Sequence, residues 1–148
     1  MSMNTKIADL MSKKVMSTTP HQTVGHVRDV MKTHSINCMP VVDSDGSPVG
    51  IVTSTDILKT DKEGTHVSQI MTEKVYTVPQ YNDVSMAARI MRNHSIHHVL
   101  ITHEGQLIGL LSSFDLLRLV EDHRFVMKNA PDVSKKGGKR KQSEQPTD

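Results

Sequence analysis

The apolar positions of this chain follow two spacings, one typical of helices and one typical of short buried strands. Apolar residues recur every three or four positions in two segments, which predicts a helix in each. The apolar faces of these helices are Val24, Val27, Val30 and Met31 in the first, and Val84, Ala87, Ala88 and Met91 in the second. Asp83, just before the second segment, is its predicted N-cap.

Extended segments surround each predicted helix in the same order. A short extended piece precedes each helix, at residues 15–18 and 75–78. Two apolar strands joined by an Asp- or Gly-containing turn follow, at residues 39–42 and 49–52 and again at 99–101 and 107–111. Closing helices are expected from Thr53 and from Ser112, the second reaching about residue 127. The predicted order is β-α-β-β-α, given twice.

The sequence is duplicated along the same lines. His34-Ser35-Ile36 recurs as His94-Ser95-Ile96, an offset of 60 (94 − 34). Residues 50–59 match residues 109–118 at an offset of 59 (109 − 50), and the lost residue falls in the turn between the paired strands. Turns tolerate such changes of length, so the two halves are predicted to share one fold.

Composition narrows the class of protein. The 148 residues include one cysteine, Cys38, and no apolar run near the roughly 18–20 residues of a membrane span. The first ten residues lack the apolar stretch of a secretory signal. We therefore expect a cytoplasmic protein that does not engage a membrane and has neither an internal disulfide nor a Cys-rich zinc site.

The last residues differ from the rest in composition. Residues 134–148 contain Lys and Arg clusters but no aliphatic or aromatic side chain, so residues 128–148 are predicted to form a disordered basic tail. Such a tail could contact nucleic acid. No aromatic residue lies nearby to stack on bases, and a solubilising role is the preferred interpretation.

One short motif, Gly-x-x-Thr/Ser-x-x-Asp, occurs once in each half. Its members are Gly50, Thr53 and Asp56, and then Gly109, Ser112 and Asp115. A glycine at a strand end permits close approach to the backbone, and a hydroxyl where a helix begins suits a phosphate. A carboxylate one turn later can accept hydrogen bonds from the two hydroxyls of a ribose. The motif favours a nucleotide, although Thr/Ser-x-x-Asp is also close to a capping box that needs no ligand.

The element order, the Pro40-Val41-Val42-Asp43 segment and the two motifs resemble CBS domains, which occur as tandem pairs. The resemblance covers residues 6 to 123. It implies an α/β (α+β) fold in which two β-α-β-β-α repeats, residues 6–62 and 63–127, pack through their sheets into one pseudo-two-fold module. It also implies a regulatory ligand, an adenosine nucleotide (AMP, ADP or ATP) or S-adenosylmethionine, bound in the cleft between the repeats.

The resemblance further implies that each cleft combines one repeat's motif with residues of the other. Thr53 and Asp56 would act with Val78, Ile96, His97 and His98. Ser112 and Asp115 would act with Thr19, Ile36, Asn37 and Cys38. Gly50 with Ile51, and Gly109 with Leu110, would complete the two sites, with Ile51 and Leu110 along the base.

Other functions have weaker support in the sequence. His94, His97 and His98 are close in sequence, but adjacent residues at a strand entry point to opposite faces, which argues against a shared metal ion. The pair His97-His98 could instead contact phosphate. No nucleophile motif is present, so we expect neither an enzyme nor a catalytic cofactor.

Partners follow from the same reasoning. We expect Met31, Ala87 and Met91 on outer helix faces, which favours a homodimer. A sensor of this kind would signal to an effector protein that the sequence does not name. The alternative is a structural interaction module in which the motifs serve only as helix caps.

Overall fold

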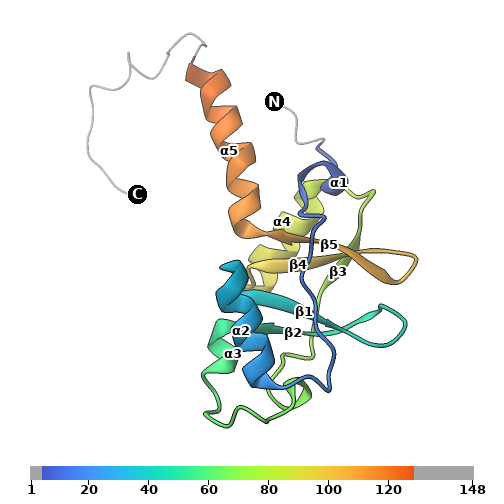
Figure 1. Cartoon of the computed structure of the whole chain (residues 1–148). Coiled ribbons are helices and arrows are strands. Elements are labelled where there is room, and N and C mark those ends of the chain that lie inside the picture. Colours follow the sequence, from blue (N-terminus) through green and yellow to red (C-terminus); the bar gives the residue numbers. More distant parts are fainter. Residues whose placement is uncertain (1–4, 129–148) are drawn as a thin grey trace. The chain divides into compact units, whose positions relative to one another are not determined.

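The computed structural model describes residues 5–128, and its elements follow the predicted order (Figure 1). The helices are α1 (Ile7–Leu10), α2 (Val24–His34), α3 (Ser54–Ile57), η1 (Val67–Gln69), α4 (Val84–His94) and α5 (Ser113–Lys128). The strands are β1 (Cys38–Val42), β2 (Pro48–Thr53), β3 (Thr77–Pro79), β4 (His98–His103) and β5 (Gln106–Ser112). Up to Leu116 the described residues form one compact unit, and α5 from Leu117 onward belongs to another. The predicted tail lies outside the described residues except for Lys128.

Helices α2 and α4 begin differently but end alike. Thr23 caps α2, because its side chain accepts a hydrogen bond from the His26 N–H at 3.2 Å. Asp83 occupies the N-cap position of α4, as predicted, but its side chain makes no cap bond and instead accepts from Ser85 Oγ at 2.7 Å. Both helices end at a serine in the left-handed conformation, Ser35 and Ser95, each with φ of 54°.

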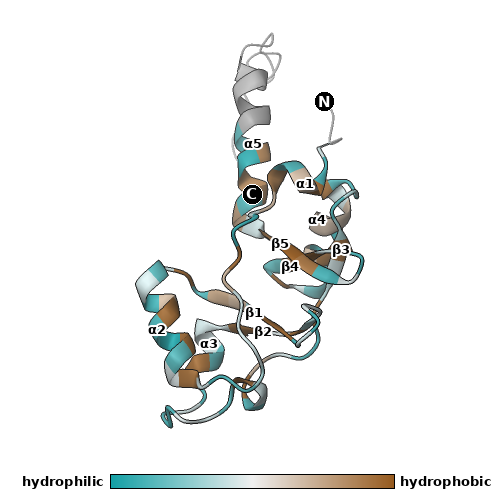
Figure 2. Cartoon of the chain, turned by 45° about the vertical axis from the view of Figure 1, so that its right-hand side comes forward, coloured by the Kyte–Doolittle hydropathy of each residue, from teal (hydrophilic) through white to brown (hydrophobic). Residues whose placement is uncertain are grey.

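The strands form two small sheets. In the first, β1 and β2 are antiparallel; in the second, β4 lies between a parallel β3 and an antiparallel β5. The extended piece before α2 makes only a single parallel bridge, between Thr18 and Val41. Apolar residues colour the strands brown and polar residues colour the β4–β5 turn teal (Figure 2). The predicted α/β fold class is confirmed.

The segment before each repeat's first strand packs on the other repeat. Val67 and Ile70, in and just after η1, join the core formed by α2, β1 and β2. At the opposite end of the unit, the Ile7 N–H in α1 donates to the Asn82 carbonyl at 2.9 Å, just before α4. The two repeats therefore exchange these leader segments, residues 6–12 and 66–72.

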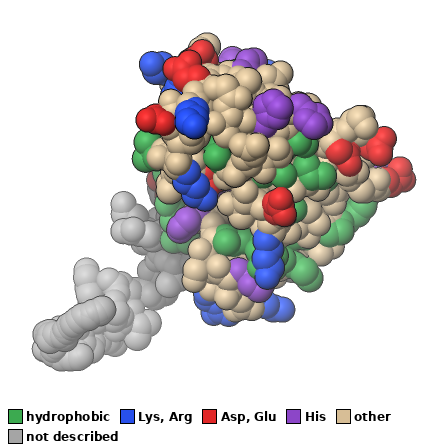
Figure 3. Space-filling model, turned by 90° about the horizontal axis from the view of Figure 1, so that it is seen from below, with side chains coloured by type: hydrophobic (Ala, Val, Ile, Leu, Met, Phe, Trp, Pro, Cys, Tyr) green, Lys and Arg blue, Asp and Glu red, His purple; other side chains and the backbone are tan. Residues whose placement is uncertain are grey.

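The predicted homodimer assumed that three residues of α2 and α4 are exposed, and this is wrong. Met31, Ala87 and Met91 are 6%, 0% and 5% exposed, so the chain's own core buries them. The large apolar residues that are exposed lie elsewhere: Met16, Leu58, Tyr81, Met86, Phe114, Leu117 and Val120. On the face seen in Figure 3, Lys and Arg side chains are interspersed with Asp and Glu. Within residues 5–128, no helix is long and apolar enough to cross a membrane.

Candidate functional site

A pocket of about 410 Å³ lies where the two repeats meet. The first repeat contributes the junction of β2 and α3, namely Ile51 and residues 53–55, together with Asn37. The second contributes residues 95–98 and Leu100. Thr72, at the end of the second repeat's leader, and residues 74–76, between that leader and β3, complete the lining. Four stretches that are separate in the sequence thus form one cavity.

The structure brings together most of the residues predicted for the first cleft. Ile51, Thr53, Ile96, His97 and His98 all line the pocket. Asn37, which was assigned to the second cleft, lines it as well. Three other residues of the first set are not part of the lining: Val78 and Asp56 are 1% and 5% exposed, and Gly50 is buried.

The carboxylate of Asp56 is engaged at the start of α3. Its Oδ2 accepts from the Thr53 N–H at 3.0 Å, while Thr53 Oγ1 accepts from the Asp56 N–H at 3.3 Å. Asp56 Oδ1 also lies 3.0 Å from Lys59 Nζ. This is a complete capping box. Ser112 and Asp115 form the same reciprocal pair at 3.1 and 2.9 Å.

A methionine side chain occupies the space beside each motif glycine where a Cβ would lie. A Cβ at Gly50 would lie 2.6 Å from Met71 Sδ, and a Cβ at Gly109 would collide with Met11 Sδ. The neighbour that approaches these glycines on the side-chain face is therefore a thioether of the other repeat's leader. The motif had instead predicted that a ligand approaches the backbone there.

Two equivalent strand-entry residues sit opposite the two motifs. Cys38 pairs with Thr53, and burial, followed by the nearby Asp56 carboxylate, raises the pKa of its thiol to about 12. His98 pairs with Ser112. Burial lowers the pKa of His98, the neighbouring His97 lowers it further, and Asp115 opposes both. The pocket therefore presents His98 mainly as a neutral imidazole, able to donate and accept one hydrogen bond each.

The remaining residues of the second predicted cleft are more scattered in burial. Gly109 and Cys38 are buried, Ile36, Leu110, Ser112 and Asp115 are half-buried, and Thr19 is exposed. The strand pairing shows that Thr18, rather than Thr19, occupies the position equivalent to Val78, because Thr18 pairs with Val41 as Val78 pairs with Ile101. Thr18 is 6% exposed, and its Oγ1 has no hydrogen-bond partner among the described residues.

The pocket residues between η1 and β3, at the end of the second leader and just after it, were not predicted from the sequence. Thr72, Lys74, Val75 and Tyr76 line the pocket, and Lys74 is the lining residue with a permanent charge. Tyr76 is held by His94, with ring centroids 4.3 Å apart and Tyr76 Oη 3.1 Å from His94 Nδ1. The missed signal was the match of residues 71–75 to residues 11–15, which marks these leaders as part of the duplicated unit.

His94 is therefore engaged with an aromatic ring and does not face His97 and His98 across a common centre. In the described part of the chain, no group of three or more His, Cys, Asp or Glu side chains is arranged to hold a metal ion.

Comparison with known proteins supports this architecture. A family model described as the CBS domain matches residues 7–63 and 67–122. An uncharacterized 17.7 kDa protein of Acidianus ambivalens is 31% identical over 139 residues, covering 91% of this chain and 85% of that protein. The inosine-5'-monophosphate dehydrogenase of Methanocaldococcus jannaschii is 29% identical over 114 residues, which cover 76% of this chain and only 23% of that enzyme.

Among solved structures, the CBS domain pair of protein MJ0100 in complex with 5'-methylthioadenosine and S-adenosyl-L-methionine is 28% identical, with a TM-score of 0.74. The match covers 80% of this chain and 98% of that one. The duplicated sequence, the two capped motifs and the match to the family model over both halves lead to one conclusion. The chain belongs to the CBS domain family, and it carries a tandem pair of these domains.

Proposed function

We propose that this chain is a regulatory module that binds an adenosine-containing ligand in the pocket beside Thr53 and signals its occupancy to a partner protein. The observation that carries the proposal is the 410 Å³ pocket, whose walls come from both repeats. Its volume lies within the roughly 300–1,000 Å³ typical of small-molecule sites. A ligand bound there touches both repeats at once, which gives it a means of changing how they pack.

The pocket lining combines apolar and polar side chains of the kinds that suit adenosine. Ile51, Ile96 and Leu100 offer an apolar surface for a base. Hydroxyls of residues 53–55, the imidazoles of His97 and His98, and the Lys74 ammonium offer polar contacts for a ribose and its 5' substituent. The lining contains no carboxylate, so an anionic substituent would meet Lys74 without repulsion. AMP, ADP, ATP and S-adenosylmethionine, which carries a carboxylate, remain the candidates.

The ligands of the MJ0100 pair support the same class of molecule. That pair is described in complex with two adenosine thioether or sulfonium compounds, and it is 28% identical to this chain. The second candidate function, an interaction module without a ligand, is favoured by a different observation. Both motifs are complete capping boxes, so their residue types are explained by helix stability alone.

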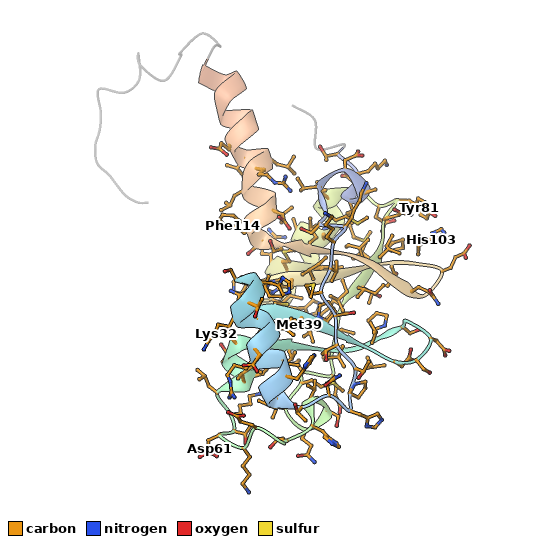
Figure 4. The ribbon with its side chains drawn as sticks, viewed as in Figure 1. Lys32, Met39, Asp61, Tyr81, His103 and Phe114 are labelled. Atoms are coloured by element: carbon orange, nitrogen blue, oxygen red, sulfur yellow. The ribbon has the colours of Figure 1, made fainter. Side chains whose placement is uncertain are left out.

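A ligand panel separates the two functions. We expect one of AMP, ADP, ATP, 5'-methylthioadenosine or S-adenosylmethionine to raise the melting temperature, because a ligand at one hundred times its dissociation constant stabilises the fold by about 2.7 kcal/mol. Lys74→Gln should weaken the phosphate-bearing ligands. Lys32→Gln, on the exposed side of α2, removes the same charge outside the pocket and should not (Figure 4). If no compound shifts the melting temperature at millimolar concentration, the interaction module is the better account.

A further inference from the structure

We propose that Met71 and Met11 are positioning residues for the two motif strands, and that Gly50 and Gly109 are glycines because these thioethers occupy the space of a Cβ. Backbone conformation does not require glycine at either place, since the glycines with positive φ among the described residues are Gly46 and Gly105. The requirement at Gly50 and Gly109 is one of space.

The contact at Gly50 is close and specific. A Cβ there would lie 2.6 Å from Met71 Sδ and 3.1 Å from Met71 Cγ. Met71 also packs against the buried core of the first repeat, so moving its side chain away from Gly50 would cost core contacts. An added methyl group at residue 50 would therefore displace the Met71 side chain, the β2 strand or both.

The displacement would reach the pocket through the residue that follows Gly50 and the residue that follows Met71. Next to Met71, Thr72 exchanges two backbone hydrogen bonds with Ile51, which follows Gly50: Ile51 N–H to Thr72 O at 2.9 Å and Thr72 N–H to Ile51 O at 2.8 Å. Thr72 and Ile51 both line the pocket. Met71 thus sets the position of a pocket wall without touching the cavity itself.

The second repeat reproduces the glycine–methionine contact and the backbone pairing beside it. The three atoms nearest to a Cβ at Gly109 all belong to Met11. Ser12 and Leu110, the residues that follow, exchange backbone hydrogen bonds of 2.9 and 3.1 Å. Each methionine comes from the leader of the opposite repeat, so the two motif strands are locked reciprocally. Repetition at both places indicates that the glycine–methionine contact is a feature of the duplicated unit.

Double substitution distinguishes this account from a glycine kept small for a ligand. Gly50→Ala should lower the melting temperature and, resting on the proposed function, weaken adenosine ligand binding at least several-fold. Adding Met71→Ala should recover part of both, because the smaller side chain vacates the space for the new Cβ. Recovery should be fuller in Gly109→Ala with Met11→Ala, since at Gly50 the Thr72 carbonyl oxygen would remain 3.1 Å from the new Cβ.

Two controls complete the experiment. Gly64→Ala has no atom within 4 Å of the new Cβ and should leave the melting temperature close to that of the wild type. Met71→Leu keeps the bulk beside Gly50 and should bind ligand as the wild type does, whereas Met71→Ala alone should bind more weakly. Affinities are measured at a temperature at which every variant is folded.

The melting temperatures decide the proposal even if no ligand binds, so failure of the proposed function is a separate result. The proposal is overturned if Gly50→Ala melts like the wild type, or if each double variant is no more stable than the sum of its two single changes predicts. A double variant that regains stability but binds as weakly as Gly50→Ala would assign Gly50 to the ligand and overturn the positioning role of Met71.

Discussion

The Asp56 side chain has two candidate roles, to bind a ribose or to cap α3. Asp56 is 5% exposed, and its carboxylate already accepts from the Thr53 N–H and faces Lys59. Each carboxylate oxygen has two acceptor sites, so these contacts leave some capacity for a ribose hydroxyl. The ribose role therefore stays a prediction, and it requires a ligand to reach a carboxylate that the pocket lining does not include.

Asp56→Asn separates the two roles. Asparagine can still accept from the Thr53 N–H, and Lys59 is 58% exposed, so the loss of unfolding free energy should stay within about 1 kcal/mol. Loss of the charged acceptor should weaken adenosine binding by roughly 1.5–3 kcal/mol, measured by calorimetry. A 2',3'-dideoxy ligand should lose a similar amount on the wild type and little more on the variant. Equal affinity for variant and wild type would leave the carboxylate with the cap alone.

His98 predicts a pH dependence of stability. Burial, then the neighbouring His97, lowers its pKa below 6.5 in the folded state, while the unfolded chain keeps the ordinary value. As the pH falls below about 6.5, the unfolded chain binds a proton that the folded chain excludes, so the unfolding free energy must fall until the folded pKa is passed. Above that window the contribution is constant.

Urea unfolding of the wild type and of His98→Gln at about pH 7.5 and pH 5.5 tests this sign. The wild type should lose more stability between the two pH values than the variant does. The other eight of the nine histidines are common to both proteins, so the difference between their slopes reports His98. A steeper loss in the variant would contradict the buried, neutral imidazole.

At the scale of elements, the spacing of apolar residues predicted the long helices and the paired strands. The α2 and α4 faces, the paired strands and the long closing helix α5 all appear where the pattern placed them. The exchanged leaders were not predicted, because α1 and η1 are too short to show a helical period. For the same reason the pocket residues that motif reasoning found are those next to Thr53 and His97, while Lys74 and Tyr76 were missed. The proposed domain limits at residues 62 and 63 remain a prediction.

The two left-handed serines suggest a stabilising change. Ser35 has φ of 54° at the end of α2, a conformation that costs an L-residue free energy and that glycine adopts freely. Ser35→Gly should raise the unfolding free energy by up to about 1 kcal/mol in chemical denaturation. Ser68→Gly, in η1, is the matched control and should lower it, because Ser68 has no such strain to relieve. A less stable Ser35→Gly protein would show that the serine side chain stabilises the helix end.

At the scale of the whole molecule, hydrogen bonds join the β1–β2 and β4–β5 hairpins at their turns. The Leu107 N–H donates to the Gly46 carbonyl at 3.0 Å, and Gln106 Nε2 donates to the Asp45 carbonyl at 2.5 Å. Residues 98 and 38, at the other ends of these hairpins, lie at the two motifs. The repeats are thus joined at the hairpin turns, through the exchanged leaders and around the pocket.

Self-association is a prediction at this scale. The argument from Met31, Ala87 and Met91 was wrong, but Leu58 and Phe114 are 83% and 77% exposed, and a second copy would remove them from water. We predict a mass of about 33 kDa by light scattering, twice the 16.5 kDa of one chain. Phe114→Asp should shift the protein toward the monomer, and Met16→Asp should not. A mass of 16.5 kDa for the wild type across micromolar concentrations would remove the homodimer.

The central claim, an adenosine ligand in the pocket shared by the repeats, is tested most directly by titration calorimetry of a variant that fills the pocket. Thr55 lines the cavity, and its counterpart in the second repeat is Phe114, so Thr55→Phe introduces a side chain that this helix position already accepts. AMP and 5'-methylthioadenosine are titrated into the wild type, Thr55→Phe and Ser44→Phe, which adds the same ring in the exposed β1–β2 turn. We predict binding to the wild type and to Ser44→Phe, and at least tenfold weaker binding to Thr55→Phe. Equal affinities for all three proteins, or no heat of binding at millimolar ligand, would contradict the claim.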